Sequence, residues 1–191
     1  MKTPFVIAVI TALLAAAFPA CAQDTTTRFE AYAGYDYARF NVQANVGGFP
    51  PMPTFNLNGG GGQFEYNASH WLGLVGDLAG YAATNSANSG AQGEAFSYLF
   101  GPRVNFRHGK ITPFARVLFG GILTSSGIES SGVQNNFAMT AGGGIDIKIT
   151  KLIAIRPVQA EYFLTKIPDG LNNRQNNFRF SAGIVFRFGR T

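Results

Sequence analysis

Few residues in this sequence are suited to acid–base or nucleophilic chemistry. There are 2 histidines, His70 and His108, and Ser69 stands directly before the first of them. A serine next to a histidine in the sequence does not indicate a nucleophile and its base, because such pairs are defined by geometry. The Cys, His, Asp and Glu residues also lack the spacing of a metal site. We therefore expect no catalytic residue, no metal, no cofactor and no enzymatic activity.

Two glycine clusters, at 59–62 and 142–144, could suggest a phosphate-binding loop. Neither cluster is followed by Gly-Lys-Ser/Thr or opens a helical pattern, so the sequence does not indicate phosphate binding. In a chain rich in β-strands, such glycines permit kinks and close packing.

Isolated charged residues within apolar segments are more informative. The sequence has 15 Lys and Arg, 10 Asp and Glu and a formal net charge of +5, but no basic run of the kind that binds nucleic acid. We expect the excess of positive charge to contact anionic lipid head groups. The role of the isolated charges depends on the elements that position them.

The first 22 residues have the layout of a cleavable signal peptide. Lys2 precedes an apolar run from Phe5 to Phe18, and Ala20-Cys21-Ala22 precedes Gln23. The apolar run is shorter than the ~20 residues that a membrane-spanning helix needs. Cys21 leaves a lipoprotein acceptor as an alternative, although Phe18-Pro19 is a poor lead-in for one. We expect a signal peptide at 1–22 and one folded domain at 23–191, which then contains no cysteine.

After residue 22 the chain divides into segments of about ten residues with alternating apolar and polar side chains, typical of transmembrane barrels. Short and long connections alternate, as in outer-membrane barrels with short periplasmic turns and long external loops. The sequence predicts an all-β, eight-stranded antiparallel up-and-down transmembrane β-barrel with both termini in the periplasm. We expect strands at 28–40, 59–67, 71–81, 95–107, 111–123, 137–149, 152–165 and 178–188.

The cost of exposing charge to lipid predicts which side chains point inward. An Arg or Lys facing lipid at mid-membrane costs about 2–4 kcal/mol, so strand parity must place charges inside. In the segment 178–188 the phenylalanines then face outward, while Arg179 and Arg187 face inward. In the segment 152–165, Arg156 is at an even position and Glu161 at an odd one. We therefore predict a parity-switching bulge near Pro157. Outward aromatic belts are expected to include Tyr35, Tyr37, Tyr66, Phe106 and Phe188.

Inward parity predicts a charge network inside the barrel. Eight strands enclose room for side chains alone, so paired charges there should form a packed polar core. A selective permeation path is the alternative. The expected neighbours are Glu30 with Arg187, Asp36 with Arg179, Asp146 with Arg156, and Asp77 with Arg103 and Arg116. The whole predicted network is Glu30, Asp36, Glu65, Asp77, Arg103, Arg107, Arg116, Asp146, Arg156, Glu161, Arg179 and Arg187.

The end of the chain carries a recognisable pattern, SAGIVFRF at 181–188. It resembles the assembly signal of outer-membrane barrels, with Gly183, Phe186 and Phe188 at the signal positions. It departs from that signal because Gly189, Arg190 and Thr191 follow. The resemblance implies that the barrel assembly machinery is a partner.

Further segments, including WLGLVGDL from 71, GPRVNFR from 101 and GGGIDIKIT from 142, resemble small bacterial outer-membrane β-barrel proteins of the OmpA-like (OmpA/OmpX-type) class. The resemblance covers essentially the whole chain after residue 22. It implies an eight-stranded barrel in the Gram-negative cell outer membrane, in contact with membrane lipid and lipopolysaccharide. Members of this class serve in envelope structure, adhesion or narrow-pore permeability.

Two functions therefore remain open. The first is a structural or surface-interaction role through four extracellular loops that contact an unidentified ligand. The second is a narrow, low-conductance porin-like channel. A soluble lipocalin-like carrier would need an apolar cavity and a polar exterior, the reverse of the predicted parity. We expect a monomer that binds no nucleic acid.

Overall fold

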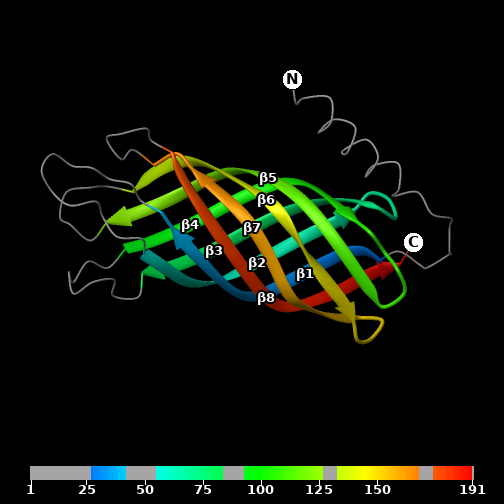
Figure 1. Cartoon of the computed structure of the whole chain (residues 1–191). Helices are drawn as coiled ribbons and strands as arrows, with labels where there is room; N and C mark the ends of the chain where they lie inside the picture. Colours follow the sequence, from blue (N-terminus) through cyan, green and yellow to red (C-terminus); the bar gives the residue numbers. More distant parts are fainter. Residues whose placement is uncertain (1–26, 42–54, 84–92, 127–132, 168–173, 191) are drawn as a thin grey trace, which may run out of the picture.

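A computed structural model describes residues 27–41, 55–83, 93–126, 133–167 and 174–190 of the chain. Consecutive strands pair antiparallel, and β1 also pairs with β8, so the sheet closes into a barrel (Figure 1). The predicted eight-stranded up-and-down fold is confirmed. The strands are β1 Thr27–Phe40, β2 Phe55–Asn67, β3 Leu72–Ala83, β4 Gly93–Asn105, β5 Ile111–Ser126, β6 Gln134–Lys148, β7 Ile153–Thr165 and β8 Gln175–Arg190. Among the described residues, none forms a helix long and apolar enough to cross a membrane.

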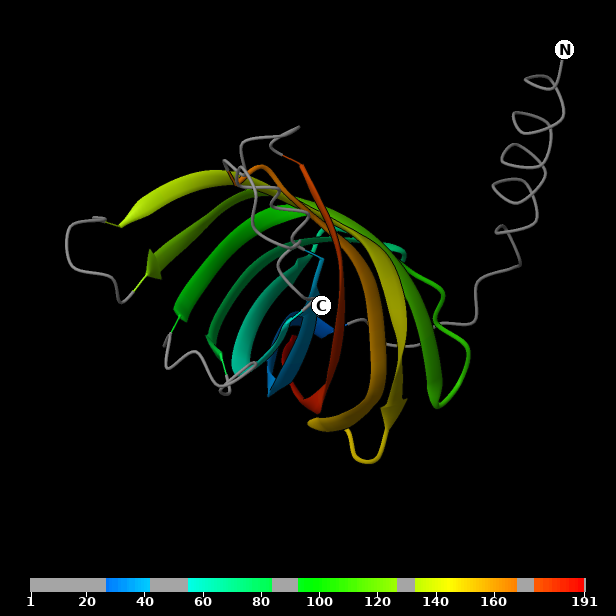
Figure 2. The ribbon, with the colours of Figure 1, turned by 60° about the vertical axis from the view of Figure 1, so that its left-hand side comes forward.

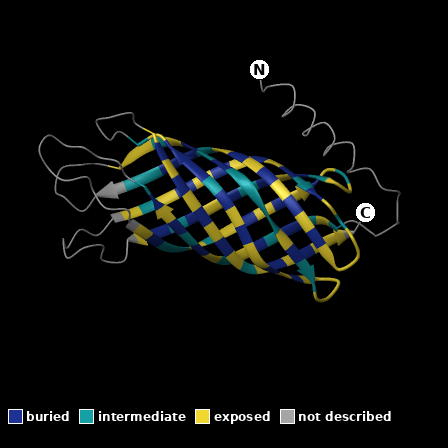
Figure 3. Ribbon diagram, in the orientation of Figure 1, coloured by how far each residue is buried: buried dark blue, intermediate teal, exposed yellow. Residues whose placement is uncertain are grey.

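The strands tilt around a common interior, as a view turned by 60° shows (Figure 2). Buried and exposed residues alternate along them, because successive side chains of a strand point to opposite faces of the sheet (Figure 3). On β8, Phe178 and Phe186 are half exposed on the outside, whereas Arg179 is fully buried inside. The predicted parity of this strand is confirmed.

The barrel has two different ends. Three short connections, at 68–71, 106–110 and 149–152, lie at what we call the turn end, where β1 begins and β8 ends (Figure 1). At the opposite, loop end, four connections lie between consecutive strands, and most of their residues are outside the described part of the chain. Every strand therefore has one turn-end and one loop-end terminus, which orders the interior residues by depth.

Several strands extend further toward the loop end than predicted. The strand β2 begins at Phe55 rather than at residue 59, and β8 begins at Gln175 rather than at residue 178. These asparagine- and glutamine-rich stretches resemble loops in composition. The ladder between neighbouring strands supplies their backbone hydrogen bonds, so they continue the sheet. At the turn end, β4 stops at Asn105, and Arg107 therefore lies just beyond the strand in which it was expected.

The predicted bulge at Pro157 is confirmed. In the pairing of β7 with β8, Arg156 is opposite Gly183 and Gln159 is opposite Ser181, so two residues of β7 face one of β8. Pro157 and Val158 both lie on the exposed side, and this pair switches the parity of the strand. Arg156 and Gln159 are consequently both buried.

Replacing Pro157 with Ala should change stability little, by less than about 1 kcal/mol. The extra residue, rather than the proline ring, produces the bulge, because either parity without it would place Arg156 or Glu161 in lipid. Urea unfolding in lipid vesicles would measure the change. A loss of several kcal/mol would show instead that the proline ring itself holds the bulge.

The outer surface carries the expected aromatic side chains. Tyr35, Tyr66, Phe106 and Phe188 are exposed, and Tyr37 is half-buried on the same face of β1 as Tyr35. Phe188 also packs against Phe29, with ring centroids 6.0 Å apart. The outer face is therefore apolar and aromatic, as a lipid-facing surface requires.

Candidate functional site: the interior charge network

The structure places the twelve charged residues predicted for the interior within the barrel or at its turn-end mouth. Eleven of them are buried and Arg107 is half-buried. Six are acids and six are arginines, so their formal charges cancel. Nine of them form two groups at different depths, while Arg107 and Arg187 lie beside Glu30 and Asp36 lies beside Ser181.

The first group, the central ring, is made of Asp77, Arg116, Glu161 and Arg179. Arg116 pairs with Asp77 at 2.8 Å and with Glu161 at 2.6 Å. Arg179 pairs with the same two acids, with Asp77 at 3.0 Å and with Glu161 at 2.5 Å. Acids and bases from β3, β5, β7 and β8 therefore alternate around a closed ring. Each carboxylate binds two guanidinium groups, which compensates for the loss of water around the buried charges.

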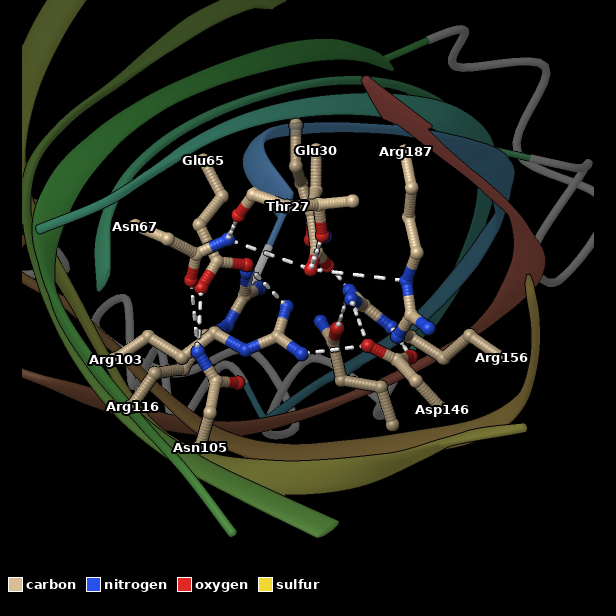
Figure 4. A network of polar contacts seen from close by, with 12 residues as sticks. Thr27, Glu30, Glu65, Asn67, Arg103, Asn105, Arg116, Asp146, Arg156 and Arg187 are labelled. Atoms are coloured by element: carbon tan, nitrogen blue, oxygen red, sulfur yellow. Dashed lines mark hydrogen bonds and ion pairs between the residues drawn. The ribbon is translucent and has the colours of Figure 1, made fainter. Parts of the chain in front are cut away.

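The second group, the turn-side cluster, comprises Glu30, Glu65, Arg103, Asp146 and Arg156 (Figure 4). Arg103 bridges two acids, at 2.8 Å from Glu65 and 2.5 Å from Asp146. Arg156 lies 2.7 Å from Asp146. Glu30, directly opposite Glu65 in the ladder, turns toward the mouth of the barrel.

Glu30 links this cluster to the turn end. Arg107 lies 3.1 Å from the Glu30 carboxylate, and Arg187 lies 3.6 Å from it. Gln159 connects the cluster to the central ring, because it accepts a hydrogen bond from Arg156 and donates one to Glu161. The two groups therefore form one continuous network from the turn end to the middle of the barrel.

Two of the four expected groupings have the predicted partners in contact. Arg187 faces Glu30 across the β1–β8 seam, and Arg156 binds Asp146. A third is partly as expected: Arg116 binds Asp77, but the guanidinium of Arg103, opposite Arg116 in the ladder, points toward the turn end instead.

Asp36 and Arg179 interact electrostatically, as expected of neighbours, but they do not form an ion pair. The register places Asp36 opposite Ser181, whose hydroxyl donates a hydrogen bond to the Asp36 carboxylate. Arg179 lies opposite Ala38, and its long side chain reaches across the barrel to Asp77. Counting strand positions did not reveal this, because an arginine in a narrow barrel can reach a strand that is not its ladder neighbour.

Aromatic rings inside the barrel take part in the network and were not singled out from the sequence. The Arg103 guanidinium lies over the Phe114 ring at 3.7 Å, and Arg156 approaches the same ring at 4.5 Å and that of Tyr32 at 4.7 Å. Such contacts stabilise a buried guanidinium. The alternation that places Arg116 inside also places Phe114 inside, so strand parity was the signal that could have identified it.

The assembly-signal residues have structural roles as well. Phe186 and Phe188 lie exposed on the outside of β8. Gly183 lies opposite Gly34 at the seam, and a Cβ on either glycine would collide with the Tyr32 side chain. The close approach of Tyr32 to the sheet therefore requires both glycines, whatever their role in assembly.

Between the central ring and the loop end lies a cluster of buried apolar side chains, which we call the apolar layer. It includes Phe40, Leu57, Leu118, Ile122 and Phe163. Buried polar side chains such as Thr165, Gln175 and Asn177 lie beside it toward the loop end. Phe40 and Phe163 pack edge to face, with ring centroids 5.7 Å apart. This layer continues the inward faces of β1, β2, β5 and β7 past the last charged residues.

A cavity of about 10 Å³ in the turn-side cluster is near the minimum that holds one water molecule. Its lining includes Glu30, Tyr32, Glu65, Arg103 and Arg156. The described residues include no group of three or more His, Cys, Asp or Glu that could hold a metal. His70 and His108 are exposed at the turn end.

A closed eight-stranded barrel with an apolar exterior and a charged interior is the architecture of a known family. Residues 8–188 match the family described as outer membrane protein beta-barrel domain. The chain belongs to this family. As an outer-membrane β-barrel protein, it resides in the outer membrane.

Solved structures show the same fold at low sequence identity. Neisserial surface protein A (NspA) is 14% identical, with a TM-score of 0.65, and the match covers 85% of this chain and 98% of that one. Ail, the attachment invasion locus protein of Yersinia pestis, is 16% identical, with a TM-score of 0.55, covering 85% and 99%. The N-terminal β-barrel domain of Pseudomonas aeruginosa OprF is 13% identical, with a TM-score of 0.53, covering 85% and 98%. No sequence among curated proteins matches the chain.

Proposed function

We propose that this outer-membrane β-barrel is a non-enzymatic scaffold that presents its four loop-end connections to partners outside the cell. The observation that carries this proposal is the filled interior. A charge-balanced network occupies the turn-end and middle parts of the barrel, and the apolar layer, with buried polar side chains beside it, occupies the loop end. A barrel closed in this way has its outer surface and loops available for interactions.

The orientation follows from the alternation of connection lengths. Outer-membrane barrels have short periplasmic turns and longer external loops. We therefore place the turn end and both termini in the periplasm, and the loop end outside the cell. As the sequence shows, the connections 41–54, 84–92, 127–133 and 166–174 are rich in Asn, Ser, Gly and Pro, and they contain two basic residues, Lys166 and Arg174.

The composition of the connections favours a neutral, hydrogen-bonding partner such as carbohydrate. Ail, one of the structural neighbours, has been crystallised with the heparin analogue sucrose octasulfate. Binding of such a polyanion depends on an excess of cationic side chains, whereas in the four connections Lys166 and Arg174 are balanced by Glu129 and Asp169. The oligosaccharide part of lipopolysaccharide, which surrounds the protein outside the cell, is the partner that we favour.

Replacing the four connections with short Gly-Ser turns tests this proposal. The variant should fold and insert like the wild type, because the strands and the interior network are unchanged. It should lose binding to oligosaccharide released from lipopolysaccharide, measured by a surface biosensor with the protein in nanodiscs. Equal binding by both proteins, or no binding by the wild type, would contradict the proposed partner.

A narrow channel is the second candidate, favoured by the polar interior. Conductance recording of the wild type in planar bilayers separates the two. A silent, correctly inserted protein supports the scaffold, whereas a large and stable conductance would overturn it.

We also propose that Phe188 is recognised by the barrel assembly machinery. Replacing Phe188 with Ser should then slow assembly in cells more than replacing Phe180 with Ser. Both side chains lie outside β8 with similar exposure, 43% and 46%, but Phe180 is outside the signal pattern. Unheated gel mobility of membrane fractions measures the folded barrel. Similar assembly of the two variants in cells would contradict recognition of Phe188.

Folding of the same two variants into detergent, without the assembly machinery, is the control. Phe188 also contacts Phe29, so a folding defect of its own has to be separated from loss of the signal. If Phe188→Ser is slowed relative to Phe180→Ser as much in detergent as in cells, the substitution acts through packing, and recognition of Phe188 by the machinery is contradicted.

A further inference from the structure

The charges of this barrel are distributed unequally between its two ends. Inside, six acids balance six arginines. Around the loop end, Arg39, Lys166 and Arg174 are exposed, and Glu94 is the one exposed acid among the described residues. The neighbouring connections add Glu129 and Asp169 by sequence. Both the interior and the loop end are thus close to neutral.

The turn end, in contrast, carries more cations than acids, since Asp24, three residues before β1, is the acid that the sequence adds there. Arg28, Lys110 and Lys151 are exposed there and Lys148 is half-buried, and no described acidic residue is exposed at this end. We call these four residues the turn-end cations. The excess of positive charge between residues 27 and 190 therefore gathers at one end of the barrel.

Exposed apolar side chains stand next to these cations. Ile149 and Leu152 lie on either side of Lys151 in the β6–β7 turn and are 58% and 62% exposed. Ile111, directly after Lys110, is 50% exposed. Apolar side chains next to cationic ones are expected at a membrane interface, where the apolar groups contact acyl chains and the cations contact phosphate head groups.

The backbone holds this arrangement in place. The Lys148 amide donates a hydrogen bond to the Lys110 carbonyl at 2.7 Å, which joins the end of the turn at 106–110 to the start of the turn at 149–152. The Thr150 hydroxyl accepts hydrogen bonds from the amides of Leu152 and Ile153, at 3.2 and 2.9 Å. The cations are therefore presented by ordered turns.

We propose that the turn-end cations bind the phosphate groups of anionic phospholipids in the membrane leaflet at the turn end. The inference rests on membrane insertion and is independent of what the loops bind. An acidic protein is a weaker candidate, because Ile149 and Leu152 sit among the cations, in the position of side chains that enter a bilayer. Phospholipid head groups supply both the charge and the adjoining apolar phase.

Photo-cross-linking in lipid nanodiscs tests the proposal. The protein is exposed to phosphatidylglycerol or phosphatidylcholine, each with a diazirine on its head group, and the modified residues are mapped by mass spectrometry. Each cation beside an anionic bilayer strengthens binding to anionic over neutral lipid by roughly five-fold. Phosphatidylglycerol should therefore label the turns at 106–110 and 149–152 at least about five-fold more than phosphatidylcholine. High salt should reduce the preference by screening.

Matched variants locate the effect. Replacing Lys110, Lys148 and Lys151 with Gln should bring the ratio of phosphatidylglycerol to phosphatidylcholine labelling at these turns close to one. Replacing the same lysines with Arg should preserve the ratio. Replacing Arg39, Lys166 and Arg174 with Gln removes the same charge at the loop end and should leave turn-end labelling unchanged. Unheated gel mobility verifies that each variant is folded.

Two outcomes would overturn the proposal. Equal turn-end labelling by the two lipids would leave an acidic protein as the partner of this surface. An unchanged preference in the Gln variant would show that the lysines do not recognise the lipid. Neither outcome affects binding of oligosaccharide by the loops, so the two proposals fail separately.

Discussion

Replacing Glu161 with Gln is expected to lower the free energy of unfolding by about 3–5 kcal/mol. Glu161 lies 2.6 Å from Arg116 and 2.5 Å from Arg179, and all three side chains are buried. Without its charge, two buried guanidinium groups share Asp77 as the remaining acid of the central ring. Removing one partner from a buried ion pair is costly because the other keeps its charge without compensation.

Urea unfolding in lipid vesicles measures this loss. Trp71, the single tryptophan, is exposed at the turn end and reports on insertion by its fluorescence. Glu94→Gln removes the same charge from an exposed position and should change stability by less than about 0.5 kcal/mol. Equal effects of the two substitutions would contradict a stabilising role for the ring.

A second substitution distinguishes charge balance from loss of packing. Glu161→Gln combined with Arg179→Gln leaves Arg116 and Asp77 as a neutral pair. The double variant should therefore lose less stability than the sum of the two single variants. An additive loss would show that the members of the ring act independently.

Removing both barriers inside the barrel is expected to convert a silent protein into a cation-conducting one. The turn-side cluster and the central ring form the first barrier, and the apolar layer forms the second. Arg103→Ala with Arg116→Ala removes two bulky cations and leaves uncompensated carboxylates, which attract cations and water. Phe40→Ala with Phe163→Ala removes the facing rings of the apolar layer.

Single-channel recording in planar bilayers should separate the contributions. The wild type and each double variant should stay near the level of a bilayer without protein, because one barrier remains in every case. The quadruple variant should conduct and should prefer cations. Tested proteins are first shown to be folded by unheated gel mobility.

The four proteins give distinct answers. If the variant with Arg103→Ala and Arg116→Ala already conducts without the phenylalanine substitutions, the apolar layer is not a barrier to ions. If the variant with Phe40→Ala and Phe163→Ala already conducts without the arginine substitutions, the charge network is permeable to ions. A folded but silent quadruple variant would show that the interior is closed by other side chains.

Much of the fold could be predicted from local pattern. Period-two alternation in segments such as 178–188 indicates strands, and the cost of charge in lipid determines which face of each strand points inward. The same reasoning located the bulge at Pro157, because Arg156 and Glu161 could share the interior only if the parity changed between them. Each conclusion needs only residues close together in the sequence.

Strand ends were less predictable. The asparagines and glutamines that open β6 and β8 have the composition of a loop, but they pair with strands that already extend to the same height. Whether such residues join a sheet depends on the length of the neighbouring strand, which is not a local property.

The sequence by itself determined the set of interior charges and their inward direction, because the energy of exposing charge to lipid acts on each strand separately. The tertiary structure alone decided which of those charges meet. Arg179 passes over its neighbour on β1 to bind Asp77 on β3, and Arg103 and Arg116 start from opposite ladder positions and diverge to different acids. In a closed barrel, long side chains from non-adjacent strands share one confined interior, so their partners depend on register, reach and available space together.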